Sequence, residues 1–149
     1  EAAVDMASWF LPLGKPIVIE SRGKNQEEKI YQSYGYDIFT NQLKLAILID
    51  DGSASASEIF AGALSEHGLA TLIGEKSFGK GSVQELVPVT ADSSLKVTIA
   101  KWLTPKHKSL VDNGLEPNII VKAATSTPMT ATSTDPVLRR AIEFLKQKK

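Results

Sequence analysis

The spacing of apolar and polar positions predicts short strands interrupted by helices. Residues 43–49 (L-K-L-A-I-L-I) are the strongest strand candidate, because their unbroken apolar second half is typical of a strand buried on both faces. A helical period follows over residues 56–66, and residues 70–74 (A-T-L-I-G) predict the next buried strand. This succession of strand, helix and strand predicts an α/β fold.

Further predicted elements flank this core on both sides. The chain opens with an amphipathic helix whose predicted apolar stripe is Ala3, Met6 and Phe10. Four more strands are predicted from alternation and apolar runs, at residues 16–20, 29–34, 83–89 and 95–103. A polar turn at residues 90–94 joins the last two strands, which predicts a hairpin.

The composition of the C-terminal end divides the chain into three parts. Residues 1–122 are predicted to form one domain, and residues 123–134 are small, polar and Pro-containing, as in a linker. Residues 135–149 predict a last helix, with Asp135 as its cap and Pro136 in its first turn. Three residues form its predicted apolar stripe, Leu138, Ile142 and Leu145.

Composition narrows the classes of function. The 149 residues include 17 Lys and Arg and 17 Asp and Glu, so the formal net charge is zero. This balance disfavours nucleic acid or an anionic membrane as the main partner. The absence of cysteine excludes disulfides, thiolate metal sites and cysteine nucleophiles, and two histidines are too few for a multi-histidine metal site. We therefore expect no cofactor.

Residues 51–58 (D-G-S-A-S-A-S-E) are the strongest candidate for chemistry, because they lie where a predicted strand passes into a helix. At a helix N-terminus the dipole favours developing negative charge, and the N–H after a serine can serve as an oxyanion donor. On this motif alone, a structural role of Ser53, Ser55 or Ser57 as a helix cap is favoured, because serine caps are common. The G-x-S-x-G pattern of a nucleophile elbow is absent.

A serine nucleophile also needs a base. His67 and His107 stand in no recognisable catalytic pattern and are predicted to lie at the surface. Lys80, between Gly79 and Gly81, is the other candidate, either as a buried base or as a solvated loop lysine. A lysine in water has a pKa of about 10.4, so only burial or a positive neighbour would make it a base.

Two motifs together resemble the carboxy-terminal processing proteases, also called tail-specific proteases. They are G-S-A-S-A-S-E at residues 52–58 and F-G-K-G-S-V-Q at residues 78–84. Weaker similarity covers other segments, at residues 11–18, 95–105 and 114–119. The resemblance implies a serine endopeptidase that cleaves proteins near their C-terminal tails. It also implies a ClpP/crotonase-like core of mixed β-sheet with packed helices, incomplete here at its N-terminus.

The resemblance implies roles for five residues. Ser55 matches the nucleophile, Lys80 matches the lysine base, and Gln84 matches the residue that orients the lysine. The N–H of Ala56 matches one oxyanion donor, and some relatives have a supporting acidic residue at the position of Glu66. Gln84 is the preferred third member, because an amide orients an amine without adding the charge that would hold it protonated.

The resemblance also implies what surrounds this chain. A PDZ domain and a glycine-rich turn with the second oxyanion donor would lie upstream of Glu1, so we expect the chain alone to have little peptidase activity. Expected partners are proteins with exposed C-terminal tails and the upstream segments of the same protein, and a homo-oligomer is compatible with the resemblance. The expected location is extracytoplasmic, in a bacterial periplasm or cell envelope.

Two alternatives to a peptidase stay open. One is a non-catalytic binding relative on the same fold, against which the complete set of Ser55, Lys80 and Gln84 argues. The other is an acyl-CoA enzyme of the crotonase type, which would need an adenine-nucleotide pocket that the sequence does not suggest.

Overall fold

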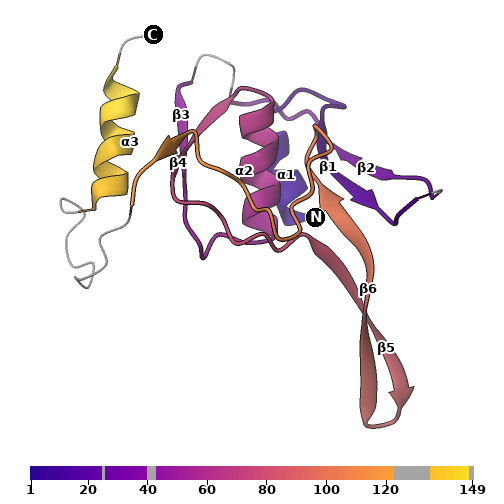
Figure 1. The fold of residues 1–149 in the computed structure, drawn as a ribbon. Helices are drawn as coiled ribbons and strands as arrows, with labels where there is room; N and C mark the ends of the chain where they lie inside the picture. Colours follow the sequence, from indigo (N-terminus) through magenta and orange to yellow (C-terminus); the bar gives the residue numbers. More distant parts are fainter. Residues whose placement is uncertain (25, 40–42, 123–134, 148–149) are drawn as a thin grey trace.

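The computed structural model of the protein describes residues 1–24, 26–39, 43–122 and 135–147. The elements follow in the order α1 (Ala2–Ser8), β1 (Pro16–Ser21), β2 (Lys29–Gln32), β3 (Leu45–Ile49), α2 (Ala56–Glu66), β4 (Ala70–Gly74), β5 (Ser82–Thr90), β6 (Ser93–Leu103), β7 (Ile119–Ile120) and α3 (Pro136–Lys146), as drawn in Figure 1. The predicted linker at residues 123–134 lies outside the described residues.

The described strands form two sheets of opposite kinds. One is antiparallel, in the order β2-β1-β6-β5, and the other is parallel, in the order β3-β4-β7. Helix α2 lies between them and contacts β1 of the first and β4 of the second, whereas α3 packs against β3 and β4 (Figure 1). The predicted α/β class is confirmed, with parallel and antiparallel pairing separated into two sheets.

The main core lies where α1 and α2 meet the sheets. Its buried members come from α1, the segment after it, β1 and α2, namely Val4, Ala7, Leu11, Ile17, Val18, Ala63 and Leu64. The predicted stripe of α1 is wrong at Met6, whose side chain is 55% exposed. The helix presents Val4 and Ala7 to the core instead, and it ends before Phe10.

Two further predictions of burial are wrong. Leu48 of β3 is 41% exposed, so the described residues leave the face of β3 on which it lies partly uncovered. In α3 the cap at Asp135 is confirmed, since its carboxylate accepts hydrogen bonds from the N–H groups of two first-turn residues. The helix nevertheless buries Ala141 and leaves Ile142 and Leu145 exposed.

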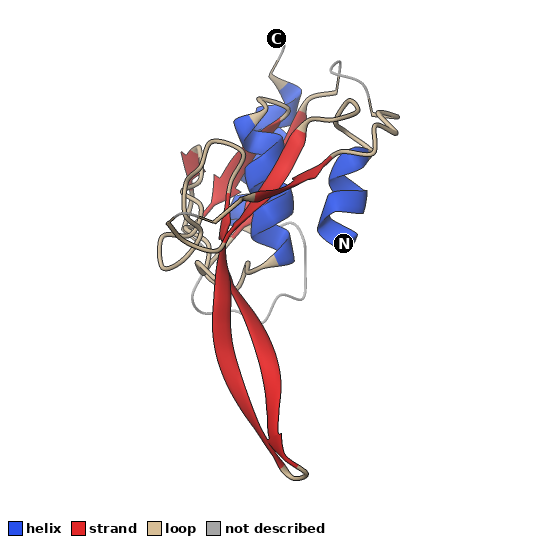
Figure 2. Cartoon of the chain, turned by 90° about the vertical axis from the view of Figure 1, so that its right-hand side faces the viewer, coloured by secondary structure: helices blue, strands red, loops and turns tan. Residues whose placement is uncertain are grey.

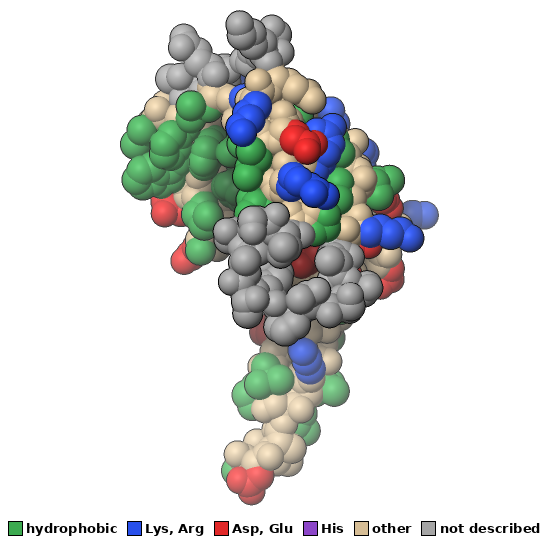
Figure 3. Space-filling view, turned by 90° about the vertical axis from the view of Figure 1, so that its left-hand side faces the viewer, with side chains coloured by type: hydrophobic (Ala, Val, Ile, Leu, Met, Phe, Trp, Pro, Cys, Tyr) green, Lys and Arg blue, Asp and Glu red, His purple; other side chains and the backbone are tan. Residues whose placement is uncertain are grey.

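The β5–β6 hairpin projects from the body of the protein (Figure 2). Its turn is tighter than the predicted loop at residues 90–94, because Thr90 already pairs with Ser93. Hydrophobic side chains remain at the surface of this arm (Figure 3), and Leu86 and Val89 are each 65% exposed. No helix in the described ranges is long and apolar enough to cross a membrane.

Candidate active site

Parallel pairing of β3 with β4 brings the two candidate motifs together. Ile49 pairs with Gly74 at the carboxyl ends of the strands, and parallel strands present these ends at the same edge of a sheet. The N–H of Glu75 continues the contact by donating to the carbonyl of Ile49 at 2.9 Å. The serine motif follows β3 and the lysine motif follows β4, so both loops leave the sheet side by side.

Gly74 is required for this close approach of the two loops. Its φ is +131°, and a Cβ there would lie 2.1 Å from the carbonyl oxygen of Ile49. Any other residue would therefore collide with the backbone of β3 as well as adopt an unfavourable φ. The glycine keeps the β4 loop tightly against the end of the strand that precedes the serine motif.

Ser55 has a strained backbone at the N-cap of α2. Its φ of 54° and ψ of −111° lie outside the regions that L-residues normally occupy. Such strain clusters at active sites, and a sharp strand-to-helix turn is how a nucleophile elbow exposes its serine. The geometry of an elbow is thus present although its glycine pattern is absent.

The other two serines of the motif differ from Ser55. The hydroxyl of Ser53 donates to the Asp50 carboxylate at 2.8 Å and accepts from the Asp50 N–H at 3.1 Å, so it stabilises the turn. Ser57 is exposed in the first turn of α2. Ser55 is the half-buried serine at the cap, where Ala56, the first helical residue, has an N–H with no partner inside the helix.

The buried carboxylate of Glu58 joins the serine turn to the lysine loop. Its Oε2 accepts hydrogen bonds from the N–H of Ser55 and from the N–H of Lys80, each at 2.9 Å. Because both bind the same oxygen at 2.9 Å, the backbone nitrogens of Ser55 and Lys80 lie no more than twice 2.9 Å apart. Its Oε1 accepts from the hydroxyl of Ser77 at 2.6 Å and from the N–H of Gly79 at 2.7 Å.

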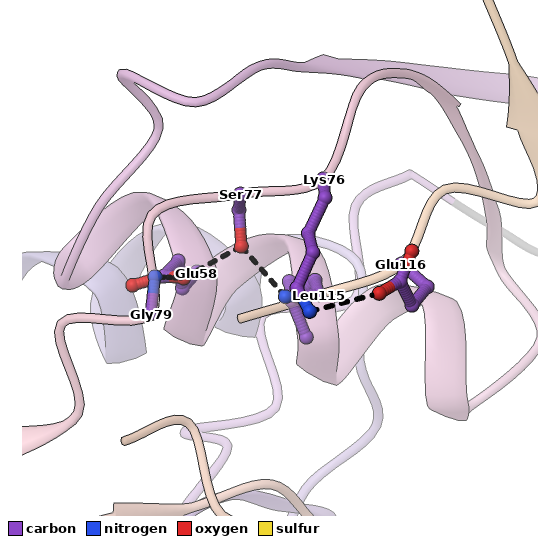
Figure 4. A network of polar contacts seen from close by, with 6 residues as sticks. All are labelled: Glu58, Lys76, Ser77, Gly79, Leu115 and Glu116. Atoms are coloured by element: carbon purple, nitrogen blue, oxygen red, sulfur yellow. Dashed lines mark hydrogen bonds and ion pairs between the residues drawn. The ribbon is translucent and has the colours of Figure 1, made fainter. Parts of the chain in front are cut away.

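The lysine loop is also tied to the segment before β7 (Figure 4). Ser77 and Leu115 exchange two hydrogen bonds, from the Ser77 N–H at 3.1 Å and from the Leu115 N–H to the Ser77 hydroxyl at 2.6 Å. The Phe78 N–H donates to the Ser53 carbonyl at 2.9 Å. The neighbouring ion pair of Lys76 and Glu116, at 3.1 Å, is exposed and contributes little.

The side chains of the predicted base and its partner point toward solvent. Lys80 is exposed, so the described residues do not provide the burial that a neutral amine requires. Gln84, near the start of β5, is exposed as well, and its amide donates to the Thr98 hydroxyl of β6 at 3.4 Å. The backbone of Lys80 therefore lies beside that of Ser55. Gln84 lies on β5, the strand that follows the lysine loop, and its side-chain amide points toward β6.

Glu66 lies at the opposite end of α2 from Ser55. Its carboxylate accepts from the Thr104 hydroxyl at 3.0 Å and from the Lys106 N–H at 2.8 Å, which holds the turn after β6. The 11 residues of α2 separate the two ends by about 16 Å at 1.5 Å per residue. In this chain Glu66 thus contacts the turn after β6, and Gln84 lies closer along the chain to the lysine loop.

The histidines stand apart from this site. His67 is half-buried rather than at the surface, and its Nε2 lies 2.7 Å from the Pro16 carbonyl oxygen. His107 is exposed as predicted, with Nδ1 at 3.6 Å from the Glu28 carboxylate. Within the described ranges no group of three or more His, Asp or Glu side chains is arranged to hold a metal ion.

Sequence reasoning missed the role of Glu58. Glu58 is the last residue of the serine motif at residues 52–58, but the motif alone does not predict a function for it. The spacing S-x-x-E from Ser55 to Glu58 is the signature of a capping box, in which the glutamate side chain accepts the N-cap N–H. That signal predicts the bond to Ser55, whereas the bonds to Ser77, Gly79 and Lys80 depend on tertiary structure.

The chain is similar in sequence to carboxy-terminal processing proteases. The carboxy-terminal-processing protease of Bartonella bacilliformis is 38% identical over 122 residues, covering 82% of this chain and 28% of the relative. The carboxy-terminal processing protease CtpB of Bacillus subtilis is 50% identical over 76 residues, covering 51% of this chain and 16% of the relative. The matched segments thus span 28% of the length of the Bartonella relative and 16% of that of the Bacillus relative.

A solved structure and a family model extend the comparison. The photosystem II D1 C-terminal processing protease superposes with a TM-score of 0.72 at 31% identity, covering 81% of this chain and 31% of that one. The model of peptidase family S41 matches residues 1–121. The chain belongs to peptidase family S41.

Proposed function

We propose that the complete protein containing this chain is a serine endopeptidase that cleaves proteins near their C-terminal tails. One observation carries the proposal: the N–H groups of Ser55 and Lys80 bind the same oxygen of buried Glu58. The backbone of a strained serine at a helix N-terminus thus lies near the backbone of Lys80, which supports a Ser/Lys pair. Family membership and the names of the relatives support the same reaction.

The proposed reaction proceeds through an acyl-enzyme. A neutral Lys80 amine takes the proton of the Ser55 hydroxyl while the oxygen attacks the peptide carbonyl. The C–N bond then breaks, and the protonated lysine transfers its proton to the leaving amine. Lys80 next takes a proton from water, the hydroxide attacks the ester, and the proton returns to Ser55. The Ala56 N–H stabilises the oxyanion in both steps.

The remaining expectations become parts of the same proposal. Substrates are proteins with exposed C-terminal tails, which the relatives' names support. A PDZ domain and upstream segments of the same protein complete the site and shield Lys80 from water, and a homo-oligomer is compatible with this arrangement. The location is extracytoplasmic, in a bacterial periplasm or cell envelope, as the family resemblance implies.

Three substitutions in the complete protein test the proposal. We expect Ser55→Ala, Lys80→Ala and Lys80→Arg each to reduce cleavage of a protein with an unstructured C-terminal tail by about a thousandfold or more. Lys80→Arg is decisive, because arginine keeps the positive charge but does not deprotonate in a protein.

Circular dichroism and thermal unfolding of each variant supply the control for folding. Cleavage that survives in folded Lys80→Arg would show that Lys80 is not the base. A folded wild-type protein that binds tailed proteins without cleaving them would instead favour the non-catalytic binding relative.

A further inference from the structure

We propose that Glu58 is a positioning residue, which fixes the nucleophile turn and the lysine loop at their working separation. The inference deepens the proposed peptidase function and rests on it. Glu58 is 1% exposed, and its carboxylate contacts the backbone of both Ser55 and Lys80. It acts through these two residues, without contacting a substrate.

The four donors around Glu58 occupy the full acceptor capacity of a carboxylate. An ionised carboxylate has about four lone-pair sites, two on each oxygen. Here Oε1 accepts from Ser77 and Gly79, and Oε2 accepts from Ser55 and Lys80. No site is left for the Lys80 ammonium, so this carboxylate holds the lysine backbone without forming the direct ion pair that would keep the amine protonated.

Burial makes this arrangement dependent on the charge of Glu58. A buried carboxylate is costly unless it is paired or fully hydrogen-bonded. The ion pairs of the described residues involve other carboxylates, so the charge of Glu58 is compensated by the three N–H groups and the hydroxyl. Its place in the first turn of α2 adds the favourable end of the helix dipole.

A neutral amide cannot replace this carboxylate. Glutamine has the same shape, but one of its oxygens is replaced by an NH₂ group, which donates hydrogen bonds. Whichever way the amide turns, at least one backbone N–H around residue 58 would face the NH₂ group. With NH₂ toward Ser55 and Lys80, both N–H groups lose their acceptor. With NH₂ toward Ser77 and Gly79, the Ser77 hydroxyl can rotate to accept from it, but the Gly79 N–H loses its acceptor. In both cases the lysine loop would move relative to the serine.

Glu58→Gln in the complete protein tests the inference. We expect kcat for a tailed substrate to fall by about a hundredfold, the effect of a misplacement of about 1 Å, with KM changed less than threefold. We also expect slower labelling by a fluorophosphonate, in which the Ser55 oxygen bonds to phosphorus and fluoride leaves. The final extent of labelling should stay complete, because a folded site with a misplaced base still reacts in time.

A matched control separates positioning from general damage. Glu116→Gln makes the same change near the same loop, but Glu116 is exposed and its carboxylate forms an ion pair with Lys76. Its kcat and labelling rate should equal those of the wild type. A merely structural role of Glu58 would lower the extent of labelling together with kcat, since fewer molecules would be folded.

Ser77→Ala keeps the inference testable if Glu58→Gln does not fold. It removes one donor to Oε1, together with the acceptor of the Leu115 N–H, and leaves the three N–H donors to Glu58 in place. We expect about a tenfold loss of kcat at unchanged KM. A folded Glu58→Gln with wild-type kcat overturns the inference; if that variant is unfolded, a folded Ser77→Ala with wild-type kcat does so. If Ser55→Ala still cleaves, the proposed function itself fails, which is a separate result.

Discussion

Ser55 has a strained backbone and lies at the N-terminus of α2, where a serine nucleophile would be placed. Its φ of 54° and ψ of −111° cost about 1–3 kcal/mol for a residue with a side chain. The conformation persists because neighbouring contacts hold the turn: Glu58 accepts the Ser55 N–H, and the Ser53 carbonyl accepts the Phe78 N–H. Backbone strain at a candidate nucleophile is the cost expected when function and stability compete.

A pair of substitutions measures this strain. Glycine tolerates the conformation of residue 55 and alanine does not, while both remove the hydroxyl. We expect Ser55→Gly to be more stable to urea than Ser55→Ala by about 1 kcal/mol, despite the larger entropy of glycine in the unfolded chain. Equal stabilities, or a less stable glycine variant, would mean that the turn relaxes without strain in solution.

Glu20 makes stability depend on pH. Burial of this β1 carboxylate raises its pKa, but hydrogen bonds from Tyr31 at 2.9 Å and Arg22 at 3.0 Å outweigh burial, so the pKa is lowered overall. Because the folded pKa lies below the unfolded value of about 4.3, the stabilisation is present above that value. It is lost as the pH falls through the folded pKa.

Comparison with Glu20→Gln isolates this contribution. The wild type should exceed the variant in free energy of unfolding at pH 6, and the difference should shrink as the pH is lowered from about 5 to 3. Urea unfolding at each pH measures both proteins. A difference that is independent of pH would assign the effect of Glu20 to packing.

For single residues, the sequence predicts which side chains belong to the candidate site better than it predicts their burial and hydrogen bonds. Motif similarity singles out Ser55 and Lys80, and the structure places their backbones on one oxygen of Glu58. The exposure of Lys80 could not be predicted from sequence, because burial depends on which parts of the chain cover the lysine. The bonds of Glu58 to the lysine loop likewise join residues about twenty positions apart.

Helix α2 organises the protein by holding a different loop at each end. Glu58 in its first turn binds the lysine loop, and Glu66 in its last turn binds the turn after β6. Between them Ala63 and Leu64 are fully buried against the core. The helix thus fixes the position of the nucleophile relative to both the β4 loop and the end of the β5–β6 hairpin.

Glu66→Gln tests whether the last turn of α2 stabilises the protein by binding the turn after β6. The amide keeps one acceptor oxygen, so either the Thr104 hydroxyl or the Lys106 N–H loses its partner. We expect the free energy of unfolding to fall by about 1.5–3 kcal/mol, as for one lost hydrogen bond to a charged group. Urea unfolding of the variant beside the wild type gives this value, and unchanged stability would show that water replaces the missing acceptor.

The elements themselves were predictable where local signals define them. The predicted helix at residues 56–66 matches α2, because a capping serine begins it and Gly68, at φ 75°, follows its end. Strand β3 was predicted with both faces covered, yet Leu48 is exposed. Burial of a strand depends on which distant segments of the chain cover it, and the apolar pattern within the strand does not show them.

At the scale of the whole molecule, the described chain leaves part of the proposed machinery uncovered. Lys80 is exposed, and the hairpin that begins two residues later carries exposed apolar side chains along its length. An isolated two-stranded ribbon is marginally stable in water, so an arm of this length is typical of a surface that packs against further protein. The chain spans 28% of the length of its Bartonella relative.

The 149-residue chain alone should therefore fold but cleave poorly. A lysine amine in water is a weak base for serine, because it is protonated at neutral pH. We expect its turnover of an unstructured tail to equal that of its Ser55→Ala variant, with circular dichroism confirming that both are folded. Robust turnover that disappears on Ser55→Ala would show that these residues suffice, and that substrate binding itself supplies the desolvation of Lys80.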